Sequence, residues 1–183
     1  MQNFVPPLVG ENHSCSECGY DYSTVSVETA RATIVRSSEE IREVALSIPD
    51  ANLRRRPDSV TWSPLEYVCH VRDVFATYTL RLHRTRTEET PTMEPMYNDL
   101  RATRFRYNER NLIAVLDELR DNAQGLIDEM DTTPDSGWQR RAVRFPGEAR
   151  TALWLVRQAA HEGAHHRLDL TAVAERLART PAS

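Results

Sequence analysis

Lysine is absent from this sequence of 183 residues, and all 23 basic residues are arginine. The absence excludes a lysine Schiff base or an ammonium nucleophile from any chemistry that the chain performs. The basic residues are outnumbered by 27 acidic ones, which gives a formal net charge of -4. Because phosphate binding needs a basic surface, this balance argues against nucleic acid as a partner.

Long apolar runs are also missing. No stretch approaches the roughly 18 residues that a membrane-spanning helix requires, and residues 1–10 lack the basic and apolar regions of a signal peptide. We therefore expect a cytoplasmic protein with no membrane partner. Thiols stay reduced in that compartment, so Cys15 and Cys18 indicate metal binding or redox chemistry rather than a disulfide framework.

Glycine is scarce, with 6 residues, and the apolar residues recur at helical spacing. Together these features predict an all-α, antiparallel four-helix bundle, a fold in which helices meet along apolar seams. Residues 25–183 are expected to form the bundle and residues 1–24 an irregular N-terminal arm. The predicted helices cover 26–48, 64–85, 98–130 and 151–177, and residues 131–149 are expected to form a loop or a short hairpin.

The clearest boundary in the chain is the start of the second predicted helix. Ser63 is a good N-cap residue, Pro64 suits the first helical position, and Glu66 completes a capping box. This helix is therefore predicted to begin at Pro64.

The fourth predicted helix carries two pairs of metal-binding side chains, each pair four residues apart. Residues at this spacing share one helix face and can bind the same ion. His161 pairs with His165, and Glu162 pairs with His166. A helical wheel places His166 in the apolar stripe, Glu162 at its margin and His161 nearly opposite. A buried site therefore favours Glu162 and His166. His161 and His165 are then either solvated surface residues, or ligands that replace or join the other pair.

A third donor is available on the second predicted helix. His70 lies at the edge of that helix's apolar face. A single histidine there is typical of a hydrogen-bonded core residue. The pair on the fourth helix also allows it to be interpreted as a metal ligand. His70, Glu162 and His166 would form a set of two histidines and one carboxylate, which leaves coordination positions open for water or substrate. His83 lies in a polar stretch and is expected to be solvated.

Two segments resemble a known family. Residues 62–70 resemble the DinB-like signature, in which a Trp-Ser pair precedes a helix bearing the first metal histidine. His165-His166-Arg167 resembles the second half of that signature, with His166 as the ligand. Glu162 then stands four residues before it, which is similar to the mycothiol-dependent maleylpyruvate isomerase branch. The resemblance covers residues 26–178 and implies a metal-binding bundle with His70, Glu162 and His166 as ligands.

The resemblance also implies a function. It indicates a metal-dependent enzyme, a transferase or isomerase that uses mycothiol or bacillithiol against a small electrophile, with the metal binding the thiol as its thiolate. Zinc is the first expectation, and nickel, iron or manganese suit the same donors. Arg72 or Arg167 would pair with carboxylates of the thiol or substrate. A hydrolase, a non-catalytic metal-binding or stress-associated bundle, and a homodimer remain open alternatives.

The arm contains a CxxC motif, Cys15 and Cys18, which is half of a zinc knuckle. A closed zinc site needs four ligands. His13 would supply a third, and no later cysteine pair completes the set. Redox chemistry, partner docking and an incidental structural role remain open for this motif, while Cys69 is expected to be a small core residue.

Overall fold

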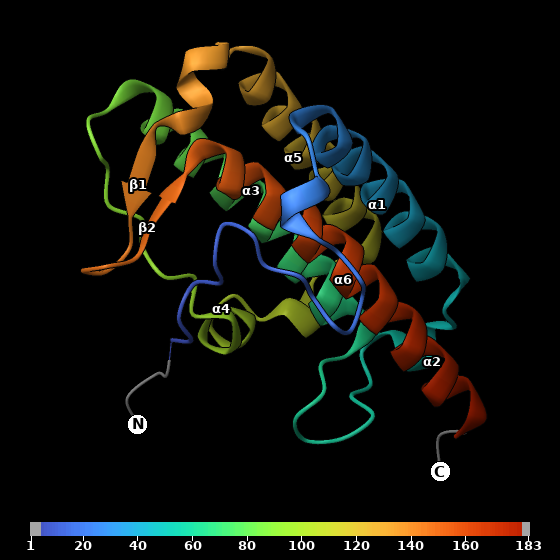
Figure 1. The fold of residues 1–183 in the computed structure, drawn as a ribbon. Coiled ribbons are helices and arrows are strands. Elements are labelled where there is room, and N and C mark those ends of the chain that lie inside the picture. Colours follow the sequence, from blue (N-terminus) through green and yellow to red (C-terminus); the bar gives the residue numbers. More distant parts are fainter. Residues whose placement is uncertain (1–4, 181–183) are drawn as a thin grey trace.

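Four long helices each begin behind a side chain that accepts a hydrogen bond from a backbone N–H of the first turn. They appear in a computed structural model that describes residues 5–180 (Figure 1). The long helices are α1 (Val27–Ser47), α3 (Pro64–Thr87), α5 (Leu112–Asp131) and α6 (Ala152–Arg179).

The four helices form a bundle, which confirms the predicted fold class. α1 and α3 each pack against both α5 and α6, so the first two long helices lie diagonally across the bundle. α1 and α6 run opposite to α3 and α5 (Figure 1). The core between them is apolar, and Ile34, Phe75, Leu119 and Trp154 are fully buried in it.

The start of α3 follows the prediction. The Ser63 hydroxyl accepts from the Glu66 backbone N–H, and the Glu66 carboxylate accepts from the Ser63 N–H. Arg56 donates two hydrogen bonds to the same carboxylate. The capping box is therefore tied to the connector that precedes it, and it fixes the helix that carries His70.

The prediction of one long helix over 98–130 was wrong. The segment contains α4 (Asn98–Arg104), a 3-10 turn η2 (Tyr107–Glu109) and then α5. Arg106 adopts a left-handed conformation with φ 52°, and Asn111 caps a new helix by accepting from Ala114 N–H. A left-handed residue cannot continue an α-helix, so the apolar periodicity spans two separate elements.

Short elements complete the chain between the long helices. These are η1 (Tyr22–Thr24), α2 (Asp50–Leu53), η3 (Asp135–Gln139), β1 (Arg141–Val143) and β2 (Ala149–Thr151). The two strands form an antiparallel hairpin in which Arg141 pairs with Thr151, and this is the hairpin alternative for 131–149. Among the described residues, no helix has the length and apolar character to cross a membrane.

The N-terminal arm, defined here as residues 5–25, lies along α6 and the hairpin (Figure 1). The Glu11 carboxylate accepts from Thr151 N–H and Oγ1–H at the start of α6. Trp154 Nε1–H donates to the Gly10 carbonyl, and Arg157 donates to the Val25 carbonyl. Residues 1–4 of the expected arm, and residues 181–183 of the expected bundle, lie outside the described residues.

Candidate metal centre

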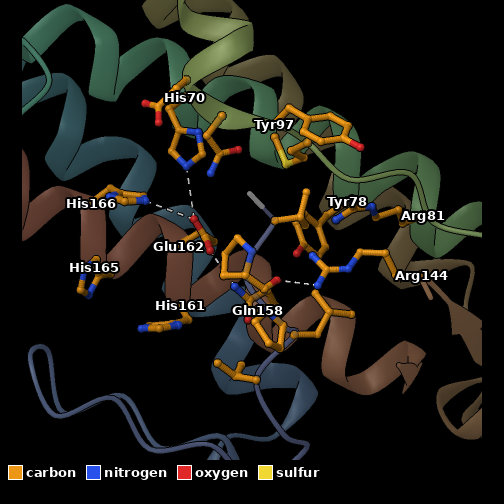
Figure 2. Close-up of a pocket in the computed structure, with 18 of the residues that line it drawn as sticks. His70, Tyr78, Arg81, Tyr97, Arg144, Gln158, His161, Glu162, His165 and His166 are labelled. Atoms are coloured by element: carbon orange, nitrogen blue, oxygen red, sulfur yellow. Dashed lines mark hydrogen bonds and ion pairs between the residues drawn. The ribbon is translucent and has the colours of Figure 1, made fainter. Parts of the chain in front are cut away.

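Two packed helices bring three donor side chains together. His70 lies on α3, while Glu162 and His166 lie one turn apart on the facing side of α6. Figure 2 shows the two histidine rings directed at the Glu162 carboxylate. One carboxylate oxygen, Oε2, lies 3.3 Å from His70 Nε2 and 3.2 Å from His166 Nε2. The ligand atoms of all three residues lie within 4.8 Å of one another.

The surroundings orient two of the three donors. The Asp169 carboxylate is 2.8 Å from His166 Nδ1 and therefore holds a proton on that atom. His166 Nε2 faces Glu162 Oε2, 3.2 Å away, and donates to it when it carries a proton. The other Glu162 oxygen, Oε1, accepts a 2.6 Å hydrogen bond from the Gln158 amide one turn earlier. The site therefore has a fixed carboxylate, and Asp169 keeps the Nδ1 proton of His166 in place when a metal takes Nε2.

Electrostatics favour an anion flanked by two imidazoles. Burial alone would raise the pKa of Glu162, but hydrogen bonds from His166 and His70 hold that pKa well below its ordinary range. Burial lowers the pKa of His70. Burial also opposes the charged form of His166, but its bonds to Asp169 and Glu162 raise its pKa to about 9. In the metal-free protein His166 therefore carries a proton that a cation would replace.

These residues fit a divalent metal ion. Nitrogen and oxygen ligands about 2.0–2.1 Å from a tetrahedral ion lie about 3.3 Å from each other, and Glu162 Oε2 is 3.2 and 3.3 Å from the two histidine nitrogens. Three protein ligands leave at least one position open, as in catalytic rather than structural sites. The donor set suits zinc, nickel, iron or manganese.

The three donors lie at the wall of a cavity of about 740 Å³. Its other walls come from residues 5–9 of the arm, residues 96–100 before and within α4, Tyr78, Arg81 and Arg144, and from Gln158, His161 and His165 of α6. Figure 2 shows Tyr78, Arg81 and Arg144 across the cavity from His70. This volume lies in the usual range for small-molecule sites.

The arginines expected at the site lie elsewhere, so that prediction was wrong. Arg167 pairs with Glu40 of α1 at 2.9 Å, and Arg72 pairs with Asp73 and Glu118. Neither arginine lines the cavity. Helix geometry directs residues 70 and 72 to different faces of α3, while Arg81 follows His70 by 11 residues and returns to nearly the same face.

Sequence reasoning missed two arginines that line the cavity. A sequence pattern could have identified one of them but not the other. Arg81 was detectable from its helical spacing to His70. Arg144 lies in the hairpin connection, and its position depends on a strand pairing that no local pattern predicts. Gln158, one turn before Glu162, carried the same four-residue signal as the metal-binding pairs.

The remaining histidines take different positions. His161 and His165 do not join the three donors and instead face Cys15 and Cys18 of the arm. The interpretation of His161 as a solvated residue was wrong, because its Nε2 is buried and burial lowers its pKa to about 4. His83 is solvated as expected, with 52% of its side chain exposed.

Comparisons with known proteins place this geometry in a family. The sequence profile described as the DinB superfamily matches residues 33–170. Comparison with curated protein sequences gave no match. The fold is similar to that of YfiT from Bacillus subtilis, described as a probable metal-dependent hydrolase with an unusual four-helix bundle topology. The two share 16% identity and a TM-score of 0.76, over 84% of this chain and 90% of YfiT.

A second solved structure is a mycothiol-dependent maleylpyruvate isomerase. It shares 15% identity and a TM-score of 0.66, over 81% of this chain and 62% of the isomerase. This chain therefore matches less than two thirds of the isomerase, and the likeness concerns the fold. Since the family profile covers most of the sequence and the bundle matches, the chain belongs to the DinB superfamily.

Proposed function

We propose that this protein is a metal-dependent enzyme that joins a low-molecular-weight thiol of the mycothiol type to a small electrophile, or isomerises the electrophile through it. The observation that carries the proposal is the open face of the His70–Glu162–His166 centre. Three donors converge on one point at the wall of a cavity large enough for a small molecule. A divalent ion held there would supply a Lewis acid that lowers the pKa of a thiol or a water.

We infer that the nucleophile comes from outside the chain. Among the described residues that line the cavity, none is a cysteine, serine, threonine or lysine. Cys69 is fully buried beside the Tyr107 carbonyl. A thiol cofactor or a water is therefore the nucleophile of this proposal, in contrast to sites that use a cysteine, serine, threonine or lysine of the enzyme.

The cavity also offers a binding group for an anion. Arg81 donates to the Glu94 carbonyl but forms no ion pair with an acidic side chain in the described part of the chain, and its guanidinium lies 4.8 Å from the centre of the Tyr78 ring. Arg144, in contrast, is paired with Glu148 at 2.8 Å. The Arg81 guanidinium is thus available to bind a carboxylate of the thiol or the electrophile and to hold it against the metal centre.

A hydrolase is the second candidate. It is supported by the likeness to YfiT, which extends over 90% of that protein's length, and it needs the same three donors with water in place of the thiol. The thiol-dependent reaction is supported by the likeness to the isomerase and by Arg81, a cavity arginine without a carboxylate partner in the described part of the chain.

The experiment is a pair of assays on the purified, zinc-loaded protein. One follows the consumption of mycothiol with a reactive electrophile, and the other follows ester and amide hydrolysis without thiol. We expect metal-dependent thiol consumption that falls to the uncatalysed rate in His70→Ala. The Arg81→Ala variant should raise KM for a carboxylate-bearing substrate about 10-fold or more, the effect of losing one charge-assisted hydrogen bond.

The matched control is His83→Ala, an exposed histidine on the same helix. It should leave both assays unchanged. Hydrolysis without thiol would identify the second candidate. Zinc bound at His70 with no turnover in either assay would contradict the proposal and indicate a non-catalytic metal-binding bundle.

A further inference from the structure

The CxxC motif of the arm meets a second pair of α6 histidines. Cys15, Cys18, His161 and His165 each offer a ligand atom, and these four atoms lie within 4.8 Å of one another. None of the four belongs to the His70–Glu162–His166 set. We propose that they form a second, closed metal site that binds zinc and fastens the arm to α6.

The arm presents both thiols from one tight turn. Gly19 N–H donates to the Cys15 carbonyl at 2.9 Å, and Cys15 N–H donates to the Tyr20 carbonyl at 2.9 Å. Gly19 closes the turn with φ +71°, a conformation that residues with a Cβ rarely adopt. An isolated antiparallel bridge between Ser14 and Asp21 holds the two ends of this turn together. The turn thus places the Cys15 and Cys18 sulfurs side by side.

His165 is oriented for the same point. Its Nδ1 lies 3.7 Å from Cys15 Sγ, close to the roughly 3.6 Å that separates a nitrogen from a sulfur ligand on one tetrahedral zinc ion. Its other nitrogen, Nε2, lies 3.4 Å from a Glu17 carboxylate oxygen and 3.6 Å from Asp169. A carboxylate at the far nitrogen is the usual partner of a metal-bound histidine.

His161 supplies an independent observation, a buried nitrogen without a partner. The Gln158 amide nitrogen donates to Glu162, so the Gln158 carbonyl oxygen faces Tyr22 and accepts its hydroxyl proton. The Tyr22 oxygen therefore accepts from His161 Nδ1, 2.9 Å away. That leaves His161 Nε2 with a lone pair, and within residues 5–180 this buried atom has no hydrogen-bond partner. Buried polar atoms are rarely left unpaired, and an ion would satisfy this one.

The donor chemistry selects zinc and a structural role. Two thiolates and two imidazoles form a complete tetrahedral shell with no open position, and soft sulfur ligands favour zinc over magnesium, calcium or manganese. An ion here would hold the arm, whose residues 5–9 line the cavity. The chain Tyr22–Gln158–Glu162 also links this cluster by hydrogen bonds to the first centre. The second site would therefore fix one wall of the cavity and support the first.

The test compares metal content and cobalt spectra of the full-length protein, purified under reducing conditions. We expect two zinc ions per chain in the wild type. The Cys15→Ser/Cys18→Ser variant should lose one and His70→Ala the other. Cobalt loading should give sulfur-to-cobalt charge-transfer absorption in the wild type and in His70→Ala, but not in the double cysteine variant. Cys69→Ala, which removes a thiol outside the cluster, should keep the band.

The wild type alone provides a second measurement, in case the double variant does not fold. Bound zinc should protect Cys15 and Cys18 from alkylation, and a chelator should expose them. Absence of the sulfur–cobalt band in reduced wild-type protein, or a disulfide between Cys15 and Cys18 after aerobic purification with zinc present, would overturn the proposal. Failure of the first centre would look different, since the wild type would then hold one ion that survives His70→Ala.

Discussion

The His70–Glu162–His166 centre and the Cys15–Cys18–His161–His165 cluster draw half or more of their donors from the same two turns of α6, yet their surroundings differ. Glu162 and His166 face His70 of α3, while His161 and His165 face the two cysteines of the arm, although all four side chains reach the wall of the cavity. One set has three hard or borderline donors, which leaves a coordination position open, and the other has four donors, which fill a tetrahedral shell. An offset of one residue on a helix thus separates a site suited to chemistry from a site suited to fastening.

The comparison shows how a helix supports two adjacent sites. Asp169 lies near both, 2.8 Å from His166 Nδ1 and 3.6 Å from His165 Nε2. Gln158 bonds to Glu162 and to Tyr22. The two sets of donors differ in what lies opposite α6, namely the bundle interior for one and the arm for the other.

The largest effect is expected from Glu162→Gln. This change removes the negative charge between two imidazoles, so the first centre should lose its ion while the second cluster keeps its own. Elemental analysis of the purified variant measures the outcome. Glu129→Gln is the matched control, because Glu129 contacts His83 at 3.3 Å in a similar carboxylate–histidine pair away from the cavity. If Glu162→Gln bound as many ions per chain as the wild type, the assignment of Glu162 as a ligand of the first centre would be contradicted.

Asp73→Ala should cause the largest loss of stability. Asp73 lies one turn after His70, and its carboxylate accepts from the Tyr107 hydroxyl at 2.6 Å and from Arg101 at 2.8 Å. Removing it leaves buried partners uncompensated, at a cost of about 3–5 kcal/mol in the free energy of unfolding. Urea denaturation measures this loss. Glu118→Ala, an exposed partner of Arg72, should cost under about 1 kcal/mol, and equal losses would contradict a special role for the α3 interior.

The hydrogen bonds to Asp73 also make the free energy of unfolding depend on pH. This dependence is no larger than the loss expected in Asp73→Ala. Burial would raise the pKa of Asp73, but bonds from Tyr107, Arg101 and Arg72 hold the pKa below its ordinary value. The folded state therefore binds fewer protons than the unfolded state, and stability rises with pH. The contribution is fully present above the unfolded pKa of about 3.9 and is lost as the pH falls through the folded value. Urea unfolding of chelator-treated protein from pH 7 to 3 should show this loss, with a shallower dependence in Asp73→Ala.

Some side chains hydrogen-bond to the ring nitrogen of a histidine that does not face the metal. Replacing them should reduce zinc affinity by a smaller amount, and at one site only. Asp169→Ala removes the acceptor of His166 Nδ1 and should weaken zinc at the first centre about 10–100-fold. Tyr22→Phe removes the acceptor of His161 Nδ1 and should weaken the second site by a similar factor. Competition with a zinc chelator measures both affinities. If each variant weakened both sites equally, the two sets would behave as one coupled site.

The smallest effect is expected from Gly163→Ala, which alters the helix that both sites share. An added Cβ would lie 2.5 Å from Ser37 Oγ and 3.1 Å from Phe75 Cζ, so the Ser37 side chain would have to shift. Overpacking of about 1–3 kcal/mol, offset by about 1 kcal/mol of helix propensity, gives a net loss of about 1 kcal/mol. Gly125→Ala on α5, where a Cβ meets nothing within 4 Å, should be stabilising, and thermal unfolding distinguishes the two.

Local patterns were sufficient to predict the bundle and the start of α3. The Ser63–Glu66 capping box uses only neighbouring residues, so it was visible in the sequence. The break between α4 and α5 was not predicted, because the apolar spacing continues across Arg106 although its backbone is left-handed. Asn111 was the available signal, as a capping residue inside an apparently continuous pattern.

The sequence predicted the first set of metal-binding residues, but it did not predict that the second set comes together. The helical wheel brought Glu162 and His166 to the core face, where His70 meets them, because both helices pack by their apolar stripes. The same wheel placed His161 opposite the stripe and thus toward solvent. It could not show that residues 5–25 return to cover that face, since Cys15 and His165 are 150 residues apart. Each half of the second cluster was recognised, and their meeting depends on the path of the arm.

Anomalous X-ray diffraction from crystals grown with zinc would test the account most directly. Data on either side of the zinc absorption edge locate each ion independently of any assay. We predict one peak among His70 Nε2, Glu162 Oε2 and His166 Nε2, and a second among the Cys15 and Cys18 sulfurs, His161 Nε2 and His165 Nδ1. A single peak shared by His161, His165 and His166, or no peak beside His70, would contradict the division of α6 into an open and a closed site.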